Sequence, residues 1–126
     1  MKNSLIFLIF FSIFIGYAQA QIDLPIREYN GITANFGQFR NNTGYTNHDG
    51  IDYQANEFTN VYPVCGGTAT TGNDPDGWGK YVIVTSNKNG KTFQSRYAHL
   101  SKILVKTGDK VNPILVVNFP SKIIDI

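Results

Sequence analysis

The dipeptide Asn89-Gly90, which separates two runs of strand-forming residues, is the feature that most constrains the fold. The run before it, residues 81–86, is YVIVTS, and the run after it, residues 91–98, is KTFQSRYA. Asn-Gly accepts the positive φ angles that a two-residue β-turn requires, so the combination predicts a tight antiparallel hairpin. A hairpin of this kind commits the centre of the chain to an antiparallel sheet.

The rest of the chain repeats this alternation of strand runs and turn residues, and it has no helical hydrophobic period of useful length. β-branched and aromatic residues gather in the expected strands, whereas Gly, Asn, Asp and Pro gather between them. We therefore predict an all-β fold, a small and mostly antiparallel β-sheet domain. The further strands are expected at Ile32–Phe36, Val61–Val64 and Thr68–Thr71, with turns at residues 66–67, 72–79 and 107–110.

The first twenty residues are typical of a secretory signal peptide. Lys2 precedes an apolar run from Leu5 to about Tyr17, and residues 18–20 are Ala-Gln-Ala, which suits signal peptidase. The apolar run is shorter than the ~20 residues that span a bilayer. We expect cleavage after residue 20, which leaves residues 21–126 as one domain. That domain is expected to be secreted, periplasmic or otherwise in the cell envelope, without membrane attachment.

Charge and cysteine content exclude two classes of protein. The formal net charge is +2, without the basic stripe of a nucleic-acid binder. Cys65 is the single cysteine, so no internal disulfide can stabilise the domain. Its apolar surroundings, VYPVCGG, indicate a buried small residue rather than a reactive thiol.

His48 and Asp52, in the stretch NHDGIDY, are candidate metal ligands. Imidazole nitrogen and carboxylate oxygen are both zinc ligands. On a regular strand, however, four residues of rise would separate the two Cα atoms by ~13 Å. A shared ion therefore needs a bend, which Gly50 permits. The spacing by itself favours an ordinary surface turn over a metal site.

Five phrases, taken in order, resemble the lysostaphin-type (LytM-type) zinc metallopeptidases. They are ITANFGQFR, HDGIDY, VYPVCGGTAT, GWGKYVIVTS and SRYAHLSKILVKTGDKV, and together they cover Ile32 to about Val111. The resemblance implies a compact antiparallel β-domain whose open groove carries a zinc ion. It also implies cleavage of the peptide cross-links or stems of bacterial cell-wall peptidoglycan or, in some members, of other glycine-rich peptides.

The resemblance also assigns roles to three residues. His48 and Asp52 match zinc ligands, and His99, in YAHLS, matches an active-site histidine that is not a ligand. Such a histidine would hydrogen-bond the attacking water or the oxyanion that forms. Judged by its own residues, His99 could instead be a partly buried histidine at a strand end.

The resemblance ends after Val111. Family members take a third zinc ligand from a late H-x-H motif, but this chain has two histidines in total and continues NPILVVNFPSKIIDI. Asp109, Asp125 and Cys65 do not match the missing position. We expect this tail to result from a frameshift, a premature stop or a gene-model error, which leaves the domain C-terminally incomplete with open strand edges.

Two functions follow from these features. The first is an exported zinc metalloendopeptidase that is weak or inactive because the third ligand is missing. The second is a non-enzymatic module of the same fold that binds cell wall or regulates another hydrolase.

Overall fold

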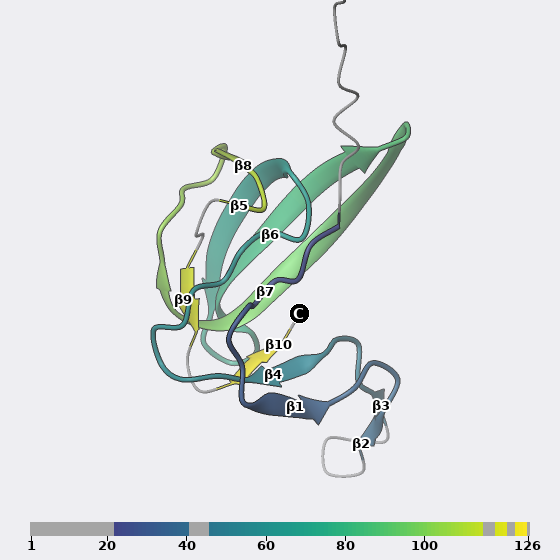
Figure 1. The fold of residues 1–126 in the computed structure, drawn as a ribbon, viewed down its shortest axis with the longest axis vertical. Helices are drawn as coiled ribbons and strands as arrows, with labels where there is room; N and C mark the ends of the chain where they lie inside the picture. The colour runs from purple at the N-terminus through teal and green to yellow at the C-terminus, as the bar shows by residue number, and fades with distance from the viewer. Residues whose placement is uncertain (1–21, 41–45, 115–117, 121–122, 126) are drawn as a thin grey trace, which may run out of the picture.

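The computed structural model describes residues 22–40, 46–114, 118–120 and 123–125, and its regular elements are strands (Figure 1). The expected signal peptide lies outside the described residues. Within them, no helix has the length and apolar character of a membrane span. The prediction of an all-β, mostly antiparallel domain is confirmed. The strands are β1 (Gly31–Ala34), β2 (Phe39–Arg40), β3 (Thr46–Asn47), β4 (Asp52–Gln54), β5 (Gly67–Asp74), β6 (Gly79–Lys88), β7 (Lys91–Ile103), β8 (Lys110–Val111), β9 (Asn118–Pro120) and β10 (Ile123–Asp125).

The strands form three antiparallel sheets. The largest has the order β8-β5-β6-β7-β9, the second has the order β1-β4-β10, and the third pairs β2 with β3. In Figure 1 the long strands β5, β6 and β7 lie side by side and curve strongly, while the small β1-β4-β10 sheet lies near one of their ends. This second sheet contains Asp52, in β4, and His48 lies in the segment between β3 and β4.

The predicted hairpin at Asn89-Gly90 is confirmed and joins β6 to β7. Lys88 pairs with Lys91 across a two-residue loop. Asn89 has φ 53° and Gly90 has φ 75°, as a turn with two left-handed residues requires. Both strands are longer than the sequence predicts, because β7 continues through the YAHLS phrase to Ile103.

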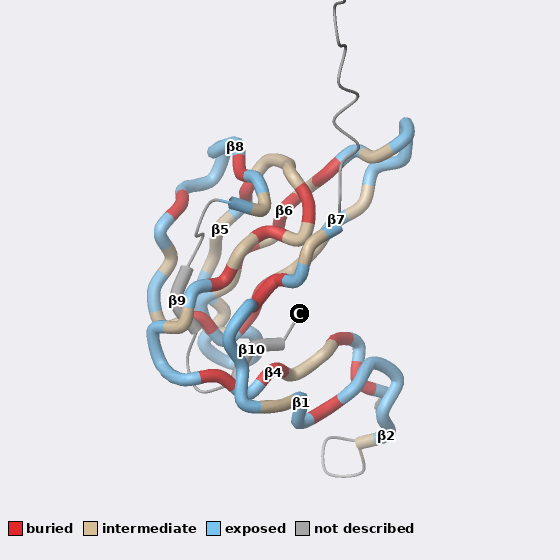
Figure 2. The backbone as a smooth tube through the Cα atoms, in the orientation of Figure 1, coloured by how far each residue is buried: buried red, intermediate tan, exposed pale blue. Residues whose placement is uncertain are grey.

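The core lies on one face of the long strands, which Figure 2 shows as alternating colours along the backbone. In β6 the side chains of Val82, Val84 and Ser86 are buried, whereas the residues between them are only partly covered. This alternation with a period of two is the pattern of a sheet with one face on the core. The buried cluster comprises Ile26, Tyr53, Ala55, Val61, Ala69, Val82, Val84, Tyr97, Leu100, Val105 and Val111.

The prediction of a strand over Val61–Val64 is wrong. This segment makes one isolated bridge, between Val61 and Ile26. Tyr62 N–H donates to the Pro25 carbonyl at 2.8 Å, but Pro63 has no N–H with which to continue a ladder. Val61 and Pro63 are nevertheless buried and close one side of the core. The neighbouring Cys65 is 1% exposed, as its apolar surroundings predict.

The described parts of the C-terminal tail pair with existing strands. β9 pairs with β7, and β10 pairs with β4. The expectation that the strand edges stay open after Val111 is therefore wrong for β4 and β7. Backbone pairing does not depend on side-chain identity, so an apolar tail can occupy an open edge that no motif marks in the sequence.

Tyr97 connects β7 to the buried 61–65 segment. Its side chain is fully buried, and its hydroxyl accepts the Val64 N–H at 2.8 Å and donates to Ser95 Oγ at 2.9 Å. Burial raises the pKa of Tyr97 above its ordinary value. The hydroxyl therefore stays protonated in the folded chain at pH values where an exposed tyrosine ionises.

We expect Tyr97→Phe to lower the free energy of unfolding by about 1–3 kcal/mol, because the buried Val64 N–H loses its acceptor. The unfolded tyrosine ionises near pH 10, before the folded one, so the stability that Tyr97 contributes is lost above about pH 10. Above this pH, the difference in the free energy of unfolding between the unmodified chain and Tyr97→Phe should become smaller. Urea denaturation at several pH values would measure it. Tyr62→Phe is the matched control, since the Tyr62 hydroxyl bonds the exposed Asn60 at 3.3 Å. An equal loss in both variants would contradict this account of Tyr97.

Candidate metal centre

A bend at Gly50 brings His48 and Asp52 together. His48 follows β3 and is 4% exposed, and Asp52 is the first residue of β4. Nε2 of His48 lies 3.3 Å from Oδ1 of Asp52. Two ligands of one zinc ion, each with a bond of ~2 Å, are expected to lie at a separation of this order. The geometry therefore suits a shared ion, while the role of both residues as ligands stays a prediction.

The orientation of the His48 ring is set by its backbone surroundings. Its Nδ1 faces the Asn35 carbonyl at 3.2 Å. Because a carbonyl only accepts, Nδ1 carries the proton, and the neutral ring then presents a lone pair at Nε2. Its backbone is fixed as well: His48 N–H donates to the Gln38 carbonyl at 2.9 Å, and Gly37 N–H donates to the His48 carbonyl at 2.7 Å.

This orientation aims two acceptors at each other. The lone pair of Nε2 and the Oδ1 atom of Asp52 repel at 3.3 Å unless a proton or a metal cation lies between them. Metal-binding histidines are commonly oriented by a hydrogen bond from the other ring nitrogen to a carbonyl, as here from Nδ1 of His48 to Asn35. The donor set thus fits two ligand positions of a zinc site.

Arg40 holds the other oxygen of the Asp52 carboxylate. Its Nη2 donates to Oδ2, and the Asp52 side chain is 14% exposed. Arg40 is the last residue of β2, so the ion pair joins the β2-β3 sheet to β4. The guanidinium keeps the carboxylate rotated so that Oδ1 faces His48.

His99 lies on a β-bulge in β7, in the neighbouring five-stranded sheet. Ala98 and His99 of β7 lie opposite the single residue Tyr81 of β6. His99 has φ 54°, its N–H donates to the Trp78 carbonyl at 2.8 Å, and its side chain is exposed. Left-handed backbone at a residue other than glycine costs energy and is concentrated at functional sites. The exposed ring differs from the partly buried histidine of the alternative interpretation.

Within the described residues, no group of three His, Cys, Asp or Glu side chains is placed to hold a metal ion. Cys65 is buried, and Asp109 accepts the Lys106 N–H at 2.8 Å inside its own turn. Asp125 lies opposite Asp52 in the register of β10 and β4, and its side chain lies outside the described residues. The described part of the chain therefore offers two candidate ligands, His48 and Asp52, and no third residue beside them.

Two further residues, Arg96 and Trp78, lie within the matched phrases, but the sequence gives neither of them a role. Arg96 Nη2 lies 3.0 Å from Asp49 Oδ2, and the Arg96 guanidinium stacks on Trp78 with Cζ 3.8 Å from the ring centroid. Trp78 also contacts Tyr81 edge to face, at 5.6 Å between centroids. The alternation of β7 is the one signal for this arrangement, since it puts Arg96 and the buried Tyr97 on opposite faces.

The family model described as peptidase family M23 matches residues 46–114. This chain belongs to peptidase family M23. The matched region contains His48, Asp52 and His99, so the resemblance to zinc metallopeptidases is confirmed at the level of the family.

Individual relatives support this assignment. The peptidoglycan DD-endopeptidase ShyA of Vibrio cholerae is 38% identical over 65 residues, which are 52% of this chain and 14% of ShyA. A zinc-containing peptidase from Vibrio cholerae has a similar fold, with a TM-score of 0.71 and 24% identity over 84% of this chain and 35% of that one. A Pseudomonas aeruginosa protein assigned to peptidase M23 gives a TM-score of 0.63 and 24% identity over 86% of this chain and 44% of its own. The chain thus spans less than half the length of each of these relatives.

Zinc titration followed by ¹⁵N NMR of the imidazoles should separate the roles of the two histidines. We expect the His48 Nε2 resonance to shift on addition of zinc, with weak affinity because two protein ligands hold the ion poorly. His48→Ala should abolish binding, and His99→Ala should leave it unchanged. Tight stoichiometric binding would show instead that a residue outside the described set completes the site.

The backbone at His99 predicts an unusual order of stability. His99→Gly and His99→Ala both remove the imidazole, but alanine keeps a Cβ in the left-handed region. We expect the alanine variant to be less stable than the glycine variant by about 1–2 kcal/mol, which thermal unfolding would measure. The same pair of substitutions at Ser101, which does not have positive φ, should show the reverse order.

Proposed function

We propose that this chain is a cell-envelope peptidase, exported by residues 1–20, that hydrolyses peptide bonds of peptidoglycan with the help of zinc. The observation that carries the proposal is the buried His48–Asp52 pair, with Nε2 and Oδ1 at 3.3 Å, inside the region that matches peptidase family M23. The substrate class is supported by ShyA, which is described as a peptidoglycan DD-endopeptidase. Glycine-rich peptides are the other substrate class that the family resemblance implies.

The roles of the residues follow from their positions. His48 Nε2 and Asp52 Oδ1 would hold the zinc ion, which when bound polarises the scissile carbonyl and lowers the pKa of water. Asn35 and Arg40 orient these two ligands from behind. His99, presented by the β7 bulge, would donate a hydrogen bond to the carbonyl oxygen as negative charge develops on it.

A second function is favoured by one observation, which is that no third ligand is found in the described residues. Two ligands leave the geometry of an ion undetermined and its affinity low. A domain that keeps the groove without a complete metal centre could bind peptidoglycan without cleaving it. The alternative is therefore a module that binds cell wall or regulates another hydrolase.

Rescue by free imidazole tests the first function directly. Purified chain is incubated with zinc and insoluble peptidoglycan, and the release of soluble peptides is measured with and without imidazole. We expect little release by the chain alone and more release with imidazole, because imidazole supplies the nitrogen ligand that the described residues lack.

The control is His48→Ala, which removes a ligand and should abolish the rescued activity. Imidazole that raises release equally in this variant would contradict a zinc-dependent mechanism. Chain that sediments with peptidoglycan, yet releases nothing under any condition, would favour the non-enzymatic module. If the chain neither binds peptidoglycan nor releases soluble peptides, both functions are refuted.

A further inference from the structure

Arg96 connects the two segments that carry the candidate site residues. Its Nη2 lies 3.0 Å from Oδ2 of Asp49, which directly follows His48 in the sequence. Its guanidinium stacks on the ring of Trp78, whose carbonyl accepts the His99 N–H. Arg96 therefore contacts Asp49, which is adjacent to His48 in the sequence, and Trp78, which is hydrogen-bonded to His99.

A cavity of about 360 Å³ opens at this point. The side chains of Arg96 and Asp49 are 30% and 70% exposed, so solvent reaches both partners of the ion pair. The cavity combines the Arg96 cation and its Asp49 partner with amide, hydroxyl and apolar groups, so a peptide carboxylate would fit there by replacing Asp49. Its lining residues are Asp49, Val64, Ile83, Gln94, Ser95 and Arg96.

We propose that Arg96 is a specificity-determining residue that binds a free carboxylate of the substrate peptide near the bond to be cleaved. This inference rests on the proposed peptidase function and names the substrate class more closely, as peptides with a carboxylate rather than neutral glycine peptides. A guanidinium has five N–H donors in one plane and binds carboxylates in a fork-like geometry. Stacking on Trp78 uses the face of this plane, so the donors at its edge stay available for hydrogen bonds.

The contact with Asp49 shows that the Arg96 guanidinium binds a carboxylate in this position. It presents a carboxylate to Arg96 from an exposed side chain, at the rim of the cavity. A substrate carboxylate would take the place of this internal one, at a modest cost because exposed ion pairs contribute little. Asp49 thus competes with the substrate, and its removal should strengthen carboxylate binding.

The opposite sign of this effect separates recognition from a structural role. If the Arg96–Asp49 pair served to fasten the His48 loop, loss of either partner would weaken the site in the same direction. If Arg96 recognises the substrate, loss of Arg96 weakens binding of carboxylates and loss of Asp49 strengthens it.

The experiment measures binding of two probes to the full chain by NMR titration, without any need for turnover. The probes are N-acetyl-D-Ala-D-Ala with a free carboxylate and the same dipeptide with a C-terminal amide. We expect the acid to bind about tenfold more tightly than the amide. Arg96→Gln should reduce this ratio to near one, Arg96→Lys should keep part of it, and Asp49→Asn should raise it about threefold.

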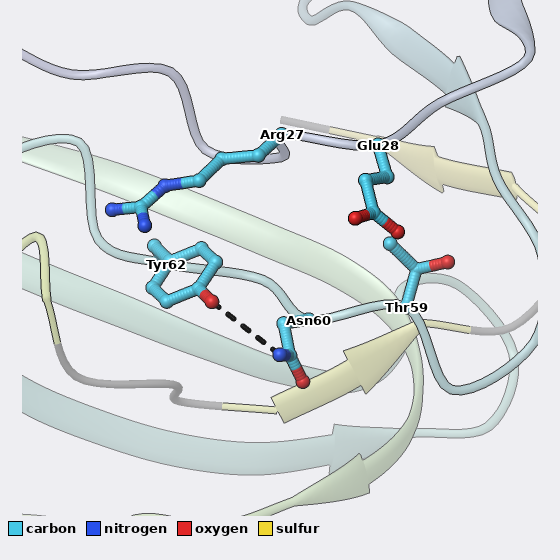
Figure 3. A pocket seen from close by; sticks show the side chains of 5 residues that line it. All are labelled: Arg27, Glu28, Thr59, Asn60 and Tyr62. Carbon is cyan, nitrogen blue, oxygen red and sulfur yellow. Dashed lines mark hydrogen bonds between the residues drawn. The ribbon is translucent and has the colours of Figure 1, made fainter.

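Arg27 provides a matched control in a separate cavity (Figure 3), which is lined by Arg27, Glu28, Thr59, Asn60 and Tyr62. Its guanidinium lies over the Tyr62 ring with Cζ 4.1 Å from the centroid, and its Nη2 is 3.9 Å from Asp23 Oδ2. Arg27 is thus another arginine that stacks on an aromatic ring and pairs with an aspartate. The two cavities share no lining residue. Arg27→Gln should therefore leave the ratio of acid to amide binding unchanged.

Several results would overturn the inference. Equal binding of acid and amide, or no binding of either, would show that Arg96 does not recognise a carboxylate. Equal losses for both probes in Arg96→Gln and Asp49→Asn would assign the pair a structural role. A changed ratio in Arg27→Gln would show a general effect of charge. These outcomes come from binding measurements, whereas the proposed function is tested by zinc-dependent release of peptides. Failure of this inference is therefore distinct from failure of the proposed function.

Discussion

The single extra residue in β7 determines which of its side chains face the core and which face the candidate site. Tyr97 and Leu100 are three positions apart, so a regular strand would place them on opposite faces. Both are buried, because the bulge at Ala98 and His99 adds one residue to β7 opposite β6 and restores the inward face. The same bulge exposes His99 in a left-handed conformation. One irregularity therefore continues the core beyond Tyr97 and exposes His99, the candidate catalytic side chain.

Asp52 has a comparable double role in the smaller sheet. Its backbone pairs with Ala34 on one side and Asp125 on the other, so it lies in the central strand of three. Its carboxylate bonds Arg40 through one oxygen and faces His48 with the other. A change of register in this sheet would move both contacts at once, since a shift of one residue turns every side chain to the other face. The geometry of the candidate metal ligands His48 and Asp52 thus depends on the correct pairing of β4.

Local chemistry explains which features the sequence could predict. Asn89-Gly90 sets its own turn through backbone angles, and Gly50 permits the bend that joins His48 to Asp52. The failed strand at Val61–Val64 has the right composition but depends on Pro63, which cannot extend a ladder. The contacts of Arg96 with Asp49 and Trp78 join residues that are far apart in the sequence, so no local pattern reveals them. The pairing of β9 with β7 and of β10 with β4 joins segments that no sequence motif marks.

Cys65 can report local opening of the folded chain, because its thiol is buried. It is the single cysteine, it is 1% exposed, and it follows the segment that the Tyr97 hydroxyl holds through Val64. A thiol reagent can reach it only when this segment detaches from the core. The rate of alkylation therefore measures how often the segment detaches. Because Val64 also lines the cavity beside Arg96, the alkylation rate of Cys65 would report how often that side of the cavity opens.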